Sequence, residues 1–259
     1  MFAFLKDEKK AKLFRRWLLT GTLLVVFIIL VFNTAFWENL LRGLFPNEKE
    51  VLYKRISLPV LVSEHLYLVF LSSTLAVTVG LFVGISVTRY AWSDFLEPVN
   101  DLSSLGQTIP PVAVLALAVP FLGFGVKPTI VALFLYSILP VIRNTIAGIQ
   151  SVSPLVIEAA EGMGMSRRQI LWKIEIPLAW RVIMAGVRMS VIINIGTATI
   201  GAVVGSGGLG TPIVSGLVRD NPALVLEGAA LAALLALITD RVLALVQSSF
   251  FKTYAREEE

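Results

Sequence analysis

The chain has 259 residues, of which 56% are hydrophobic and 15% charged, with a net charge of +4 at neutral pH. A mean hydropathy of +0.80 indicates a protein whose main solvent is lipid and excludes a soluble globular domain. The lack of cysteine excludes disulfides and thiolate metal sites, and His65, the single histidine, excludes an imidazole-rich metal site. Most basic residues lie beside apolar segments, where they act as topology signals, so we expect no nucleic-acid partner.

Apolar runs with at most one charged residue each predict an all-α polytopic membrane helix bundle. A helix that crosses the hydrocarbon layer needs on the order of 20 residues, so the length allows about five or six spans. The runs lie at residues 17–37, 66–88, 102–126, 128–142, 182–204 and 222–239. The first run follows a basic leader of the kind found in signal peptides. It exceeds the roughly 7–15 apolar residues of a cleaved signal, so we expect a retained first span.

The distribution of Lys and Arg predicts the orientation of this bundle. Basic loops tend to remain on the cytoplasmic side of a membrane. With six spans and a cytoplasmic N-terminus, most of the 22 basic residues fall inside. This orientation places the charged stretch at 158–179, between the fourth and fifth spans, in the cytoplasm.

Prolines and small residues mark two further features of the spans. Pro110, Pro111 and Pro120 interrupt the predicted third span, and Pro140 interrupts the fourth. These helices are either broken along a solute path or only kinked where neighbouring helices cover the freed backbone. Small residues at every fourth position favour close packing, within the bundle or across a dimer; they are Gly80, Gly84, Gly228, Ala232 and Ala236.

The loop between the fourth and fifth spans carries the signals of two short helices. Ser153 followed by Pro154 is typical of a helix start. Gly162 and Gly164 can end this first helix. Its apolar positions recur at helical spacing on one face and are Val156, Ala159, Ala160 and Met163.

A second helix is predicted directly after the glycine turn. Ser166 and Gln169 fit a capping box that would start it, and Pro177 closes the segment. Its apolar side consists of Ile170, Leu171 and Ile174. An apolar helix face held beside a membrane must be buried on lipid headgroups or on another protein.

The segment "EAAEGMGMSRRQILWKIEIP" resembles the EAA signature of permease subunits of bacterial ABC importers. The positions that carry the resemblance are Glu158, Ala159, Ala160, Gly164, Ile174 and Pro177, with Ile176 standing where Leu is usual. In that family the segment is the coupling helix, which docks into a groove of the cytoplasmic ATPase. The resemblance therefore implies that these six residues couple the chain to an ATPase.

A wider resemblance covers residues 61–247. The segments "QTIPPVAVLALAVPFLGFG", "ALFLYSILPVIRNTIAGI" and "GSGGLGTPI" are similar to permeases of osmoprotectant importers that carry glycine betaine or choline. Permeases for methionine and phosphonates share the EAA and glycine-rich motifs but less of the stretch before these motifs. The resemblance implies a permease core at 61–248, preceded by an N-terminal cytoplasmic segment, first span and external loop at 1–60 and followed by a cytoplasmic tail at 249–259.

The same resemblance implies the partners and location. They are a cytoplasmic ATPase dimer that binds ATP, a second permease subunit that is identical or paralogous, and an external solute-binding protein, all at the plasma membrane of a bacterium. The chain itself is then expected to have no catalytic residue, no metal and no bound cofactor. The lack of a phosphate-binding "GxxxxGK[ST]" sequence agrees with ATP hydrolysis on a separate subunit.

The sequence "GSGGLG" at 205–210 matches the dinucleotide fingerprint G-x-G-x-x-G. That fingerprint requires a preceding strand and a βαβ unit, whereas membrane spans flank this one. Dense glycines instead favour a tight turn with close backbone approach. The resemblance implies that Gly205, Gly207, Gly208 and Gly210 lie at the outer mouth, where a binding protein docks.

Few charges fall inside the spans, where an ionised group costs at least about 2.5 kcal/mol. Glu64 and His65 are interpreted as boundary residues at the outer start of the second span, and Glu227 as lying near the outer end of the sixth. Arg188 lies well within the fifth span and is either an inner gate or a packing residue. A self-contained secondary transporter or channel is the alternative to a permease subunit, but it does not explain the EAA loop.

Overall fold

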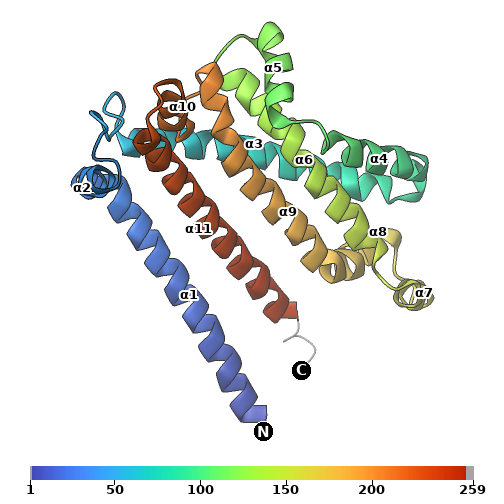
Figure 1. The fold of residues 1–259 in the computed structure, drawn as a ribbon. Helices are drawn as coiled ribbons and strands as arrows, with labels where there is room; N and C mark the ends of the chain where they lie inside the picture. The colour runs from blue at the N-terminus through green and yellow to red at the C-terminus, as the bar shows by residue number, and fades with distance from the viewer. Residues whose placement is uncertain (1, 255–259) are drawn as a thin grey trace.

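The computed structural model describes residues 2–254, with side chains from 14 to 248, and every regular element in that part is a helix. The long helices are α1 (Phe2–Phe32), α3 (Leu58–Val87), α6 (Val126–Gln150), α9 (Ile176–Ala198) and α11 (Pro222–Tyr254). The shorter α-helices are α2 (Thr34–Leu44), α4 (Leu96–Gly106), α5 (Pro111–Leu122), α7 (Pro154–Gly162), α8 (Arg167–Ile170) and α10 (Gly210–Val218). The 3-10 helices η1 (Tyr90–Phe95) and η3 (Ile200–Val204) and the π-helical turn η2 (Leu171–Glu175) complete the set. The predicted all-α bundle is confirmed (Figure 1).

Five helical segments of the described chain are long and apolar enough to cross a membrane; they are Phe14–Phe32, Leu58–Val87, Val126–Gln150, Arg167–Ala198 and Pro222–Ser248. A sixth crossing exists only as a broken one, since Tyr90–Gly106 and Pro111–Leu122 are bent by 98°. The span predicted at 102–126 is therefore present only as a broken one. Pro110 adopts an extended backbone with ψ 134°, and Pro111 begins the new helix α5, so these two prolines interrupt the span, and of the two alternatives the broken helix is the one observed here.

The other two prolines do not end their helices. Pro120 lies inside α5 and Pro140 inside α6, which begins at Val126 and continues beyond the predicted end at 142 to Gln150. The Asn144 side chain donates a hydrogen bond to the Pro140 carbonyl (2.9 Å). A Cβ on Gly186 of α9 would lie 2.7 Å from the same carbonyl oxygen. Pro140 is thus a packed position inside a continuous helix, and of the two alternatives for the fourth span the one with covering neighbours is observed.

The first span also ends earlier than predicted. Asn33 leaves helical geometry with φ −100° and ψ 81°, and its side chain accepts a hydrogen bond from the Phe36 amide (3.0 Å). This N-cap starts the separate helix α2 and ends α1 at Phe32 rather than at residue 37.

α6 packs along both α3 and α9 and forms the centre of the bundle. Gly80 and Gly84 of α3 face α6, and a Cβ on Gly84 would lie 2.7 Å from the Cβ of Thr145. Gly228 of α11 faces the segment before α10, where a Cβ would lie 2.6 Å from the Leu209 carbonyl oxygen. These glycines therefore serve close packing within the chain.

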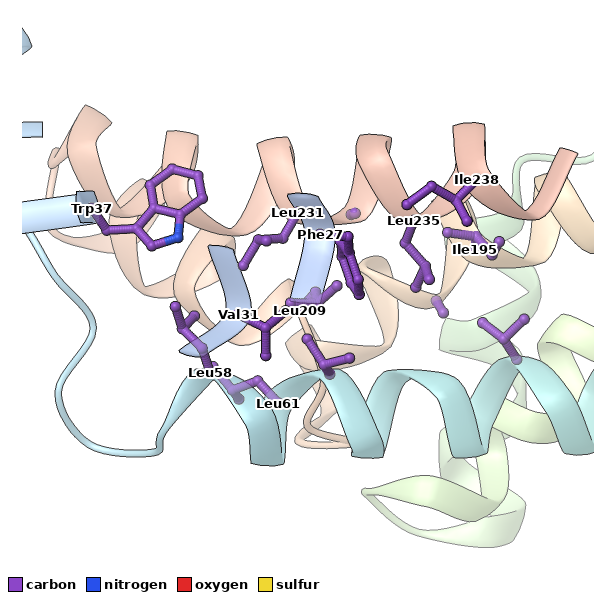
Figure 2. Packing of buried hydrophobic residues seen from close by; sticks show 14 of the residues in the cluster. Phe27, Val31, Trp37, Leu58, Leu61, Ile195, Leu209, Leu231, Leu235 and Ile238 are labelled. Atoms are coloured by element: carbon purple, nitrogen blue, oxygen red, sulfur yellow. The ribbon is translucent and has the colours of Figure 1, made fainter. Parts of the chain in front are cut away.

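The main hydrophobic core lies between α1, α3, α9 and α11. Figure 2 labels its members Phe27, Val31, Trp37, Leu58, Leu61, Ile195, Leu209, Leu231, Leu235 and Ile238. The Trp37 indole, which is buried, also donates a hydrogen bond to the Leu30 carbonyl (2.9 Å). The N-terminal span thus joins the bundle through one face, a point that the sequence left open. The division of the chain at residues 60 and 248 stays a prediction.

The helix directions separate the two sequence motifs. α6 and α9 are antiparallel and joined through α7 and α8, so the hairpin of residues 154–175 lies at one end of the bundle. The glycine loop of residues 205–210 follows α9 and lies at the other. Figure 1 shows α7 at the lower end and α5 and α10 at the upper end. We refer to these as the hairpin end and the glycine-loop end.

Candidate functional site

The hairpin is built by the local signals that the sequence predicts. α7 begins with Pro154 in its first turn and ends at Gly162, and Gly164 has φ +76°, a conformation that favours glycine. The Ser166 hydroxyl accepts from the Gln169 amide (3.4 Å), while the Ser166 amide donates to the Gln169 side chain (2.8 Å). The predicted capping box is thus confirmed, and it starts α8.

Most apolar side chains of the hairpin are not covered by the rest of the chain. Ala160 is fully buried and Ile170 is buried against the bundle. Leu155 and Met163, by contrast, are 75% and 73% exposed, and Trp172 is 64% exposed. Three large apolar side chains exposed on one short hairpin indicate a segment that meets a partner or lipid.

The second arm of the hairpin does not stop at Pro177. α8, the π-helical turn η2 and α9 follow one another without a break from Arg167 to Ala198. Pro177 lies in the first turn of α9, and the preceding π turn changes the hydrogen-bond pattern where the proline amide is missing. The prediction that Pro177 closes the segment is therefore wrong. The arm and the fifth span are parts of one continuous helical rod.

An ion pair ties this rod to α3 at the hairpin end. The Arg89 guanidinium donates to the Glu175 carboxylate at 2.6 Å, and it also donates to the Thr88 hydroxyl (2.9 and 3.2 Å). The Glu175 side chain is 9% exposed and that of Arg89 is 30% exposed. The Arg167 guanidinium lies 5.8 Å from the centre of the Tyr90 ring, just beyond α3. The hairpin is therefore held to two spans at once.

The glycine loop folds back onto the start of α3. Gly205, Gly207 and Gly208 have φ values of +77°, +81° and +78°, which L side chains rarely adopt. The Gly208 amide donates to the Glu64 carboxylate (2.8 Å). A Cβ on Gly207 would collide with the same carboxylate, and the φ of +81° already favours glycine at this position. The predicted tight turn with close backbone approach is confirmed.

Comparisons with known proteins agree with this geometry. Residues 76–252 match the family described as the binding-protein-dependent transport system inner membrane component. The chain belongs to this family of ABC importer permeases. The permease is 42% identical over 220 residues to the osmoprotectant import permease protein OsmY of Salmonella typhimurium, covering 85% of this chain and 90% of the relative. It is 39% identical over 210 residues to the glycine betaine/carnitine/choline transport system permease protein OpuCB of Bacillus subtilis, covering 81% and 93%.

A solved structure shows the same fold. The MetNI methionine ABC transporter in an inward-facing conformation matches the permease with a TM-score of 0.65. The match covers 73% of this chain and 94% of that chain at 23% sequence identity. The helix arrangement is therefore that of an ABC importer permease.

Arg188 is a contact between two spans of the permease. Its guanidinium donates to the Asp240 carboxylate through Nε (3.1 Å) and Nη2 (2.6 Å), and to the Gln247 side chain through Nη1 (3.0 Å). Gln247 in turn donates to the Arg181 carbonyl (3.0 Å). Arg188 thus joins α9 to α11. The sequence predicted that this residue is either a gate or a packing residue. The packing contact is present, and the gate role stays a prediction.

Glu64, His65 and Glu227 make hydrogen bonds that were not predicted from the sequence. His65 is fully buried and donates through Nε2 to the Ile195 carbonyl (3.0 Å), beneath Gly208. Glu64 holds the glycine loop, and Glu227, 1% exposed, accepts from the Tyr53 amide (2.9 Å) and anchors the loop before α3. Both Glu64 and His65 lie in the second turn of α3, which begins at Leu58, and their position at the membrane boundary stays a prediction.

The ion pair between Arg89 and Glu175 was not predicted from the sequence, which indicates it only weakly through the positions of the two residues. Arg89 directly follows a predicted span and Glu175 lies two residues before the EAA proline, but 86 residues separate the two. Among the described residues, no group of three or more His, Asp or Glu side chains lies close enough to hold a metal.

Proposed function

We propose that this permease forms the membrane pathway of an importer for small osmoprotectants with a quaternary ammonium group, such as glycine betaine or choline. Of the two relatives that support this substrate class, one is named for osmoprotectant import and the other for glycine betaine, carnitine and choline, and both align over most of both chains. A methionine or phosphonate importer is the second candidate, favoured only by the fold match to a methionine transporter at 23% identity. Uptake assays with betaine, choline, methionine and phosphonate distinguish the two.

The observation that carries the proposal is the hairpin with its uncovered apolar surface. Leu155, Met163 and Trp172 would meet a groove of a cytoplasmic ATPase dimer, which binds and hydrolyses ATP on its own chains. The hairpin is rigidly continuous with α9, and Arg89 and Glu175 join it to α3. Movement of the ATPase would thereby tilt two spans together, and no unfolding of a linker is needed.

The remaining partners follow from the same proposal. Two permease subunits, identical or paralogous, form one pathway in lipid, and an external binding protein delivers the solute at the glycine loop. The N-terminus and the hairpin then face the cytoplasm of a bacterium. The permease itself holds no cofactor in this scheme.

We expect Glu158→Ala and Gly164→Ala each to lower solute-stimulated ATP hydrolysis of the reconstituted importer about tenfold or more. Glu158 is exposed on α7, and Gly164 has a positive φ that alanine adopts only with strain, which would misdirect the hairpin. Gly162→Ala is the matched control, because this glycine is also exposed and has nothing within 4 Å but lacks the positive φ. Membrane insertion should be unchanged in all three. Wild-type coupling in both test variants would overturn the proposed role of the hairpin.

The absence of cysteine makes the orientation directly measurable. Lys49 and Ser153 are exposed residues at opposite ends of the bundle. In intact cells, a membrane-impermeant maleimide should label Lys49→Cys at once and Ser153→Cys only after permeabilisation. The reverse pattern would place the hairpin outside and exclude a cytoplasmic ATPase as its partner.

The sequence left a secondary transporter as the alternative from a different class, and the family match argues against it. It predicts solute uptake by the purified chain alone, in liposomes without an ATPase. The proposed function predicts none under those conditions, and uptake that depends on the complete importer and on ATP.

A further inference from the structure

A small pocket lies beside the glycine loop and is not accounted for by the hairpin mechanism. Its volume is about 280 Å³, and it is lined by Ser63, Glu64, Tyr67 and Leu68 of α3, by Val126 and by Ser206. The four α3 residues recur at i, i+1, i+4 and i+5 and so share one face of the helix. Ligand pockets in proteins commonly hold roughly 300–1,000 Å³, so this volume suits a very small solute.

The pocket carries a negative charge that the described chain leaves without a counter-ion. The Glu64 carboxylate accepts one hydrogen bond, from the neutral Gly208 amide at 2.8 Å. Within residues 14–248, no Lys or Arg side chain forms an ion pair with it. A carboxylate near apolar surroundings is stabilised by an approaching cation, and a diffuse cation with a small hydration cost is favoured there.

Two other lining residues, Tyr67 and Ser206, can contact further groups of a cationic ligand. The Tyr67 ring is an aromatic surface of the kind that attracts quaternary ammonium groups. Ser206 is only 5% exposed, and its hydroxyl has no hydrogen-bond partner although it lines the pocket. A buried hydroxyl without a partner is unfavourable until a ligand supplies one. Charge, aromatic surface and free hydroxyl thus meet in one small space.

The geometry points to a binding site for a hydroxyl-bearing quaternary ammonium cation, such as choline, in this pocket. Glu64 neutralises the ammonium group, Tyr67 covers it, and the Ser206 hydroxyl hydrogen-bonds to the ligand hydroxyl. The site would receive the solute at the glycine-loop end, before it passes between the spans. The inference rests on the proposed substrate class and adds a selective element within the permease itself.

The test measures radiolabelled choline binding to the permease–ATPase complex in nanodiscs, without binding protein. Glu64→Gln is the decisive variant, because the amide oxygen can still accept from Gly208 while the charge is lost. We expect choline affinity to fall at least about tenfold in Glu64→Gln, and about threefold to tenfold in Tyr67→Leu. Tyr67→Phe keeps the ring and should stay within about twofold of the wild type.

A neutral analogue isolates the charge. The carbon isostere of choline, 3,3-dimethylbutan-1-ol, should compete at least about tenfold less well than choline in the wild type and equally well in Glu64→Gln. Glu50→Gln is the matched control, because it removes an exposed carboxylate at the same end but outside the pocket. Unchanged choline binding in both Glu64→Gln and Tyr67→Leu overturns the inference. Choline and betaine uptake by the wild-type importer is measured separately, and its absence overturns the proposed function instead.

Discussion

Gly210→Ala is expected to destabilise the permease by about 3 kcal/mol or more, at the upper end of overpacking effects. A Cβ at this position would collide with the Thr199 carbonyl group, and its carbon would lie only 2.6 Å away. Because the obstacle is backbone at the end of α9, no rotamer change can relieve it. The thermal unfolding midpoint of the purified chain, followed by tryptophan fluorescence, should drop by many degrees, and the yield of folded protein should fall.

Gly196→Ala provides the matched control for this experiment. Gly196 lies near the end of α9 and is exposed, and a Cβ added there would have nothing within 4 Å. Alanine in a helix is favoured over glycine by roughly 0.5–1 kcal/mol, so this variant should unfold at the same temperature as the wild type or slightly higher. If Gly210→Ala is as stable as Gly196→Ala, the close contact of the glycine loop with α9 is not present in the protein.

The second large effect is expected at the hairpin end. Glu175→Ala leaves the Arg89 guanidinium without its carboxylate at a half-buried position. Breaking a fully buried pair costs roughly 3–5 kcal/mol, and the 30% exposure of Arg89 reduces this to about 2 kcal/mol. If the pair also transmits movement from the hairpin to α3, solute-stimulated ATP hydrolysis should fall about tenfold. The unfolding midpoint and the stimulated hydrolysis rate are measured on the same preparation.

The double variant separates the pair from its two members. In Arg89→Ala/Glu175→Ala no charge is left unpaired, so the stability loss should be smaller than the sum of the two single losses. Coupling should nevertheless stay low, because the link between α9 and α3 is absent. Additive stability losses, or full coupling in the double variant, would show that the ion pair does not join the two helices functionally.

Local structure around the hairpin could be predicted from the sequence because its determinants are local. The Ser166–Gln169 capping box acts within four residues, and the turn glycine Gly164 needs only its own backbone conformation. The prediction failed at Pro177, where a proline was expected to end a helix. A π-helical turn precedes Pro177, which lies in the first turn of α9, and the helix continues through it.

The third predicted span is present as a broken one. Composition alone made 102–126 a single apolar segment, yet Pro110 and Pro111 divide it into two helices at 98°. Pro140 is also a proline in an apolar run, but its helix is continuous, and Gly186 packs against its carbonyl oxygen. A proline in an apolar run therefore has no fixed outcome until its neighbours are known.

By itself the sequence determined that this is an all-α membrane permease with an EAA hairpin and a glycine turn, because composition, capping and glycine spacing act over a few residues. Only the tertiary structure decided what the charged groups contact. Glu64 meets Gly208 across 144 residues, and Arg188 meets Asp240 across 52. Such contacts depend on how distant segments of the chain align in space. The position of a residue along its own helix does not determine that alignment.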